Sequence, residues 1–147
     1  MKTPMKMQEK IILRVVARAC IPFILLFGLY VQFHGDFGPG GGFQAGVIFA
    51  AAFILYGLIF GLGKLNEVVS PRTIEILVAS GLLLYAAVGF TNLGMGGNFL
   101  DYRVIDSHDP MHGLHYGILI IELGVGITVT AAMLAIFYAF AGRERRA

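Results

Sequence analysis

Four long blocks of apolar residues constrain this chain more than any other feature of its sequence. They cover about residues 11–33, 43–62, 72–93 and 116–141, and each is as long as the roughly 20 residues that an α-helix needs to cross about 30 Å of hydrocarbon. Strands of a membrane barrel would be shorter and would alternate apolar with polar residues, which these blocks do not. Composition agrees, because 57% of the 147 residues are hydrophobic and only 14% are charged. The sequence predicts an all-α integral membrane protein, a single membrane domain over residues 1–147 with four transmembrane helices.

Basic residues predict how these helices are oriented. Arg103 follows the third block, and every other basic residue flanks the opposite ends of the helices: Lys2, Lys6, Lys10, Arg14, Arg18, Lys64, Arg72, Arg143, Arg145 and Arg146. By the positive-inside rule, both termini and the 63–71 loop are cytoplasmic, and the 34–42 and 94–115 loops face outward. No small-residue cleavage pattern follows the first block, so we expect it to remain as an uncleaved helix.

A glycine-rich segment separates the first two helices. It runs Gly38-Pro39-Gly40-Gly41-Gly42-Phe43-Gln44-Ala45-Gly46. Unpaired backbone groups cost several kcal/mol in hydrocarbon, so irregular backbone at this place must be wet or covered by protein. The segment is therefore a candidate docking or ion-facing surface. Small residues on all of the later helices indicate either partner proteins in the membrane or ordinary close packing of membrane helices.

Two carboxylates lie within the predicted spans. Glu75 follows Arg72 by three residues, which predicts a local ion pair. Glu122 lies about 10 Å inside the outward end of the last helix, at about 1.5 Å per residue, among apolar neighbours. Such a carboxylate costs about 2.5 to 3.5 kcal/mol and must face a partner chain, face a water cavity or stay protonated. Two roles fit this residue, a proton relay and a structural hydrogen bond to a neighbouring chain.

The predicted outward loops carry the histidines together with several aspartates. His108, His112 and His115 have helical spacing that suits zinc or copper, but Pro110 and Gly113 interrupt the segment, so no metal site is predicted. The alternatives are a rim that concentrates cations and an ordinary solvated loop. No cofactor or catalytic motif is present, no cofactor is expected, and the net charge of +2 gives no indication of nucleic acid binding. We expect no enzyme activity.

The segment from Phe33 to Gly46 resembles the signature of the MnhB family, small membrane subunits of the multisubunit cation/proton antiporters of the Mrp type, also called Mnh or Sha. The signature is a small residue or histidine near the end of helix 1 followed by Pro-Gly-Gly-Gly-Phe-x-Gly-Gly, and the segment from Glu122 to Gly126 is similar to the acidic-Leu-Gly-Val segment of the family's last helix. Ala45 stands where a second glycine is usual and Glu122 where aspartate is common. Size and four-helix layout are also similar.

The resemblance implies a multi-pass, non-catalytic subunit of a prokaryotic inner-membrane complex that exchanges Na+ or another cation for H+. Its partners would be other membrane subunits of a hetero-oligomeric antiporter and the lipid bilayer. The resemblance implies an ion path at Glu122, His34 and Asp36. The motif and packing residues that it implies are Pro39, Gly40, Gly41, Gly42, Phe43, Gly46 and Gly124.

Other settings remain open at this stage. Related subunits occur in membrane-bound hydrogenases and similar respiratory complexes. An independent small ion carrier, a purely structural membrane adaptor and a zinc or copper sensor are further alternatives.

Overall fold

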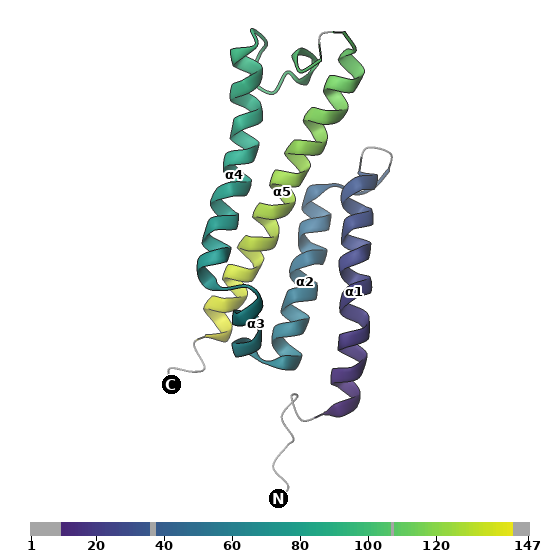
Figure 1. Cartoon of the computed structure of the whole chain (residues 1–147), viewed down its shortest axis with the longest axis vertical. Helices are drawn as coiled ribbons and strands as arrows, with labels where there is room; N and C mark the ends of the chain where they lie inside the picture. Colours follow the sequence, from purple (N-terminus) through teal and green to yellow (C-terminus); the bar gives the residue numbers. More distant parts are fainter. Residues whose placement is uncertain (1–9, 36–37, 107, 143–147) are drawn as a thin grey trace, which may run out of the picture.

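The computed structural model describes residues 10–35, 38–106 and 108–142, and these residues are mostly helical (Figure 1). Four of the described helices are long and apolar enough to cross a membrane, which confirms the predicted all-α class and its four spans. The long helices are α1 (Ile11–His34), α2 (Gly42–Phe60), α4 (Pro71–Gly94) and α5 (Pro110–Ala141), and the connections contain α3 (Leu62–Val68) and the 3-10 turn η2 (Tyr102–Val104).

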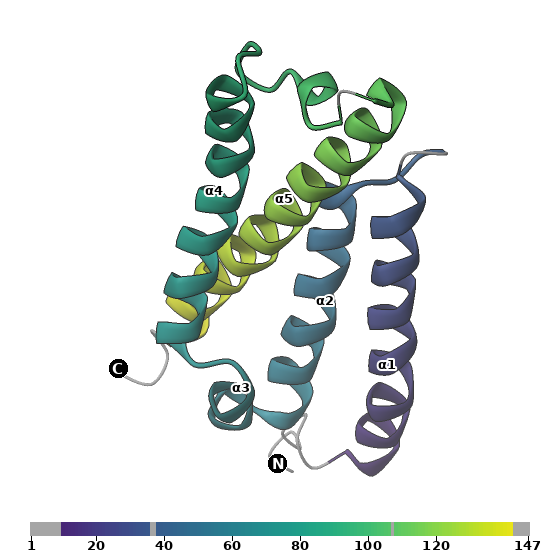
Figure 2. The same ribbon diagram turned by 45° about the horizontal axis from the view of Figure 1, so that its top comes forward.

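The four long helices stand side by side in the order α1, α2, α5, α4 (Figures 1 and 2). α2 and α5 are the two inner helices, because α2 packs between α1 and α5, and α5 packs between α2 and α4. α1 begins and α5 ends at the same end of the molecule (Figure 1). The side of the membrane on which this end lies stays a prediction. The arrangement is a single layer of helices, so only 11% of the most apolar window of α1 and 33% of that of α2 is buried.

Side-chain caps mark where α4 and α5 begin. Ser70 accepts a hydrogen bond from the Thr73 amide (3.1 Å), and Asp109 accepts from the Met111 amide (3.0 Å) and the His112 amide (3.4 Å). A proline is the first residue of both helices, where its missing N–H costs nothing. The predicted start of the last helix at residue 116 was therefore wrong, because Pro110 begins this helix and does not interrupt it.

The segment that links α2 to α4 is more ordered than the predicted 63–71 loop. Gly61, with φ +98°, ends α2 and allows the seven-residue α3 to start immediately. Leu65 of α3 is fully buried, and the Tyr138 hydroxyl of α5 donates to the Val69 carbonyl (2.7 Å). The α3 segment thus packs against the ends of both α2 and α5. The predicted ion pair between Arg72 and Glu75 is absent from the pairs found in the described residues.

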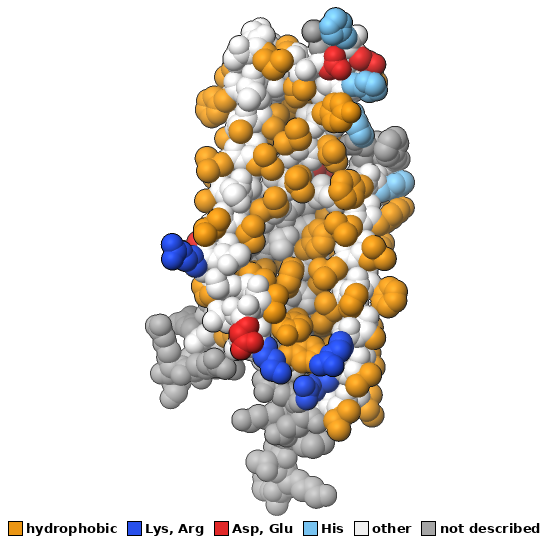
Figure 3. Space-filling model, viewed as in Figure 1, with side chains coloured by type: hydrophobic (Ala, Val, Ile, Leu, Met, Phe, Trp, Pro, Cys, Tyr) orange, Lys and Arg blue, Asp and Glu red, His pale blue; other side chains and the backbone are white. Residues whose placement is uncertain are grey.

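The two helical hairpins are staggered along the long axis. At the end away from the termini, α4 and α5 extend beyond α1 and α2 (Figures 1 and 2). At about 1.5 Å per residue, the 19 residues of α2 span about 28 Å and the 32 residues of α5 about 48 Å. On the face in Figure 3, hydrophobic side chains cover the length of the molecule, Lys and Arg gather toward the terminal end, and His lies toward the other end. The α1–α2 turn therefore meets α5 part-way along its length.

Candidate functional site

The carboxylate of Glu122 lies against the glycine-rich turn between α1 and α2. A Cβ built on Gly41 would be 2.7 Å from Glu122 Oε1, and one built on Gly35 would be 2.8 Å from Glu122 Oε2. Gly41 has φ +111° and precedes α2, and its amide donates to the Val31 carbonyl (3.2 Å). Only glycine suits this position, because the backbone conformation and the adjacent carboxylate both exclude a side chain.

Below the carboxylate, the backbones of α2 and α5 are in direct contact. A Cβ on Gly42 would overlap the Glu122 carbonyl oxygen, and one on Gly46 would be 2.8 Å from the Gly126 carbonyl oxygen. Gly35, Gly41 and Gly42 together form what we call the glycine cradle. The two features that the sequence presented separately, a glycine run and a carboxylate within a span, are thus one site.

The electrostatics of the glycine cradle favour negative charge. Glu122 is partly buried and lies beside the N-terminus of α2, which has no side-chain cap. The N-terminal end of a helix carries a partial positive charge, and anions bind there.

Gln32 is a site residue that the sequence reasoning missed. Its side chain is 4% exposed, its Nε2 has no hydrogen-bond partner within the described residues, and its Oε1 is 2.9 Å from where a Cβ on Gly126 would lie. The Thr130 hydroxyl is 2.7 Å from the Gly126 carbonyl oxygen and 3.1 Å from that of Gly46. Polar groups therefore continue along α5 for two turns below Glu122. The sequence feature that could have revealed Gln32 is that it is a lone amide in the apolar second half of α1.

Other predicted site residues lie around the same turn or away from it. His34 stacks on Tyr30 with ring centroids 5.0 Å apart, and a Cβ on Gly38 would be 3.2 Å from its Nε2. Gly40 is close to the Val31 carbonyl oxygen, since a Cβ there would be 2.8 Å away. Gly124 faces the other way, toward the Gly81 carbonyl oxygen of α4 (3.0 Å from a built Cβ).

Two residues of the family motif are exposed on the surface, and one predicted site residue lies outside the residues that the structure describes. Pro39 is exposed, and Phe43 is 60% exposed on the first turn of α2. Asp36, named with Glu122 in the predicted ion path, lies outside the described residues.

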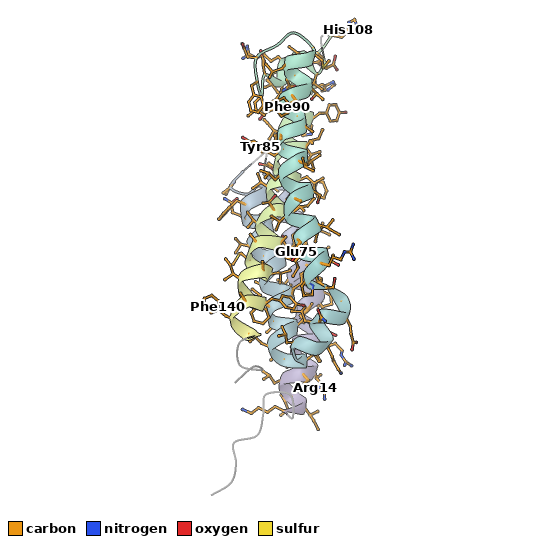
Figure 4. The ribbon with its side chains drawn as sticks, turned by 90° about the vertical axis from the view of Figure 1, so that its left-hand side faces the viewer. Arg14, Glu75, Tyr85, Phe90, His108 and Phe140 are labelled. Carbon is orange, nitrogen blue, oxygen red and sulfur yellow. The ribbon has the colours of Figure 1, made fainter. Side chains whose placement is uncertain are left out.

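His108 and His112, near the start of α5, are separate from the glycine cradle. His108 lies at the end of the molecule opposite Arg14 (Figure 4), and His112 Nδ1 is 3.6 Å from Asp109 Oδ2. Within the described part of the chain, no group of three or more His, Cys, Asp or Glu side chains could hold a metal ion.

Comparison with known proteins identifies the family. Residues 12–135 match the model of the domain related to the MnhB subunit of the Na+/H+ antiporter. The chain belongs to the MnhB family. It is 34% identical to the "Putative antiporter subunit mnhB2" of Staphylococcus haemolyticus strain JCSC1435 and 31% identical to the protein of that name from Staphylococcus aureus strain Newman. Each comparison covers 92% of this chain and 96% of the relative.

The MnhB match extends over the whole candidate site. It begins near the start of α1 and ends after Thr130, so it contains the glycine cradle, Glu122 and Gln32. With its four apolar helices, this MnhB-family chain is a multi-pass membrane protein. Its match to a transporter component agrees with the absence of a recognisable catalytic motif in the sequence.

Proposed function

We propose that this protein is a membrane component of a multisubunit Na+/H+ antiporter in a prokaryotic inner membrane, and that Glu122 in the glycine cradle is part of its ion path. The family match supports the first part of the proposal. The contact of both Glu122 carboxylate oxygens with the positions of Gly35 and Gly41 carries the second part. His34, beside the same turn, and Asp36 would be the groups through which this path opens outward.

Depth in the membrane supports a transport role for Glu122. α4 and α5 each contain an apolar stretch long enough to cross a membrane, and both helices extend beyond the α1–α2 turn (Figure 1). If these apolar lengths are embedded, the turn lies below the membrane surface. Irregular backbone at such a depth is found where it is buried in protein or lines a water-filled cavity. A carboxylate at this place would exchange protons or cations with such a cavity.

The Gln32 amide, whose Nε2 has no hydrogen-bond partner within the described residues, supports the same proposal. A buried donor without a partner costs about 1 to 3 kcal/mol, and this cost is recovered if water or a moving charge pairs with the amide during function. Gln32 faces Gly126, which is one helical turn from Glu122. We infer that its amide holds a water or the Glu122 carboxylate in one state of the transport cycle.

Replacement of Glu122 by Gln tests this function, with Glu75→Gln as the matched control on the exposed surface of α4. In membrane vesicles that contain the complete complex, we expect Glu122→Gln to assemble normally and to lower the rate of Na+/H+ exchange at least about tenfold, which corresponds to about 1.4 kcal/mol in the activation free energy of transport. Glu75→Gln should exchange normally. Normal exchange in assembled Glu122→Gln complexes would refute a role for this carboxylate in the ion path.

A further inference from the structure

A cluster of cations at the terminal end of the molecule surrounds an aromatic pair. The guanidinium groups of Arg14 and Arg18 each lie 5.7 Å from the ring centroid of Phe60, and Lys64 follows on α3. The Tyr56 and Phe60 rings pack 4.8 Å apart. Figure 3 shows Lys and Arg gathered beside hydrophobic side chains toward this end. We call these five residues the basic groove.

The basic groove contains two cavities, each lined by both cationic and apolar side chains. A cavity of about 200 Å³ is lined by Arg18, Ile21, Pro22, Tyr56, Phe60 and Lys64. A second cavity, of about 150 Å³, is also bordered by Arg18 and is lined by Ile11, Arg14, Val15 and Arg18. No described carboxylate lines either cavity, and none of the three cations forms an ion pair within the described residues. The groove therefore has three positive charges above an apolar floor.

Packing holds the aromatic floor in place. Phe60 is 9% exposed and belongs to a buried cluster with Ala17 and Ile59, against which Ile21 and Tyr56 also pack. A cation within about 6 Å of an aromatic centroid is attracted to the ring face. Phe60 therefore orders both guanidiniums before any ligand arrives, which lowers the entropy that binding would cost.

We propose that the basic groove binds the phosphodiester headgroup of an anionic phospholipid, with an acyl chain along the apolar surface between α1 and α2. The groove lies where α2 ends, at the level of the headgroups if α1 and α2 span the bilayer. Basic pockets between membrane helices bind such headgroups, and arginine forks match phosphate oxygens. Three cations that form no ion pair within the described residues favour an anionic lipid over a zwitterionic one.

The test uses the full-length protein, purified in mild detergent with any proteins that accompany it and stripped of lipid. Phosphatidylglycerol or phosphatidylcholine is then titrated in, and bound lipid is counted by native mass spectrometry. We expect saturable binding of phosphatidylglycerol but not of phosphatidylcholine. Each cation removed should weaken binding about fivefold, and the Arg14→Gln/Arg18→Gln double variant about 25-fold. Arg72→Gln, a cation near the same end on α4, is the control and should bind normally.

Two further variants separate binding from folding. Arg14→Lys/Arg18→Lys keeps both charges and should retain most of the binding, whereas Phe60→Leu should weaken it by releasing the guanidiniums. Equal binding of both lipids, or normal binding by the double glutamine variant, would overturn the proposal. Displacement of the lipid by inorganic phosphate at equal concentration would do the same. So would loss of a co-purifying protein from the double variant with lipid binding intact, because the cations would then serve a protein partner.

Discussion

At the residue scale, glycines leave room for Glu122, and the Gln32 amide lies beside Gly126, one helical turn further along α5. Gly35 and Gly41 leave room for the two carboxylate oxygens, and Gly42 leaves room for the Glu122 backbone. Any side chain at Gly41 would require a conformation that costs about 1 to 3 kcal/mol and would also displace the carboxylate. The glycines are thus needed for the position of the Glu122 carboxyl group as well as for helix packing.

Gln32 provides a prediction that separates stability from transport. Gln32→Leu removes a buried donor that has no partner within the described residues, so we expect an unchanged or higher melting temperature in detergent. We expect Na+/H+ exchange in vesicles to fall about tenfold, as for loss of a hydrogen bond to a charged group worth about 1.5 kcal/mol. Gln44→Leu, at an exposed position of α2, is the control. A lower melting temperature with normal exchange would indicate a structural role for Gln32.

At the element scale, close backbone contact between α2 and α5 positions the site. Gly46 faces the Gly126 carbonyl, and the Thr130 hydroxyl of α5 lies within hydrogen-bond distance of the Gly46 carbonyl. α4 meets the opposite face of α5 in a similar way, at Gly81 and Gly124. Small residues allow this approach, and the resulting packing is what holds membrane helices together.

Replacement of Gly42 by Ala tests this contact. The new methyl would overlap the Glu122 carbonyl, so α2 must move away from α5, at a cost of about 1 to 3 kcal/mol as in other overpacked sites. We expect a lower melting temperature and reduced exchange. Gly94→Ala is the matched control, because nothing described lies within 4 Å of its Cβ position. Equal melting temperatures for the two variants would show that α2 and α5 are not held by this contact.

At the scale of the whole molecule, a single layer of helices leaves broad apolar faces uncovered. Phe27 on α1, Leu82 on α4 and Ile136 on α5 are each more than half exposed, at 56%, 62% and 58%. Lipid can cover such faces, and so can other membrane proteins. A layer that presents both faces suits a protein placed between neighbours in a larger assembly.

Purification from the native membrane tests this arrangement. If the chain is part of an antiporter complex, mild-detergent extraction of a tagged form should recover larger multi-helix membrane subunits in fixed ratio, identified by mass spectrometry. Accompanying iron-sulfur or hydrogenase subunits would instead place it in a respiratory complex. Recovery of the chain alone as a homo-oligomer would contradict the proposed assembly and would direct attention to ion flux through the purified chain in liposomes.

The sequence by itself determined the class of the fold and the number of spans. The thickness of hydrocarbon sets the length of a spanning helix, so composition along the chain is sufficient to find one. It also indicated the two parts of the candidate site, because irregular glycine-rich backbone and a carboxylate are both costly in a membrane and therefore stand out from an apolar sequence. The start of α5 was missed, although Asp109 followed by Pro110 is a recognisable helix start.

Only the tertiary structure decided which helices are neighbours. The order α1, α2, α5, α4 depends on complementary surfaces between segments far apart in the chain, and apolar character is nearly the same on every helix. The contact between Glu122 and the glycine cradle depends on the stagger between the α1–α2 and α4–α5 hairpins. This stagger places the α1–α2 turn part-way along α5 (Figure 1). The burial of Gln32 and the presence of the basic groove were recognisable only once these neighbours were known, because burial and cavities are properties of packed helices.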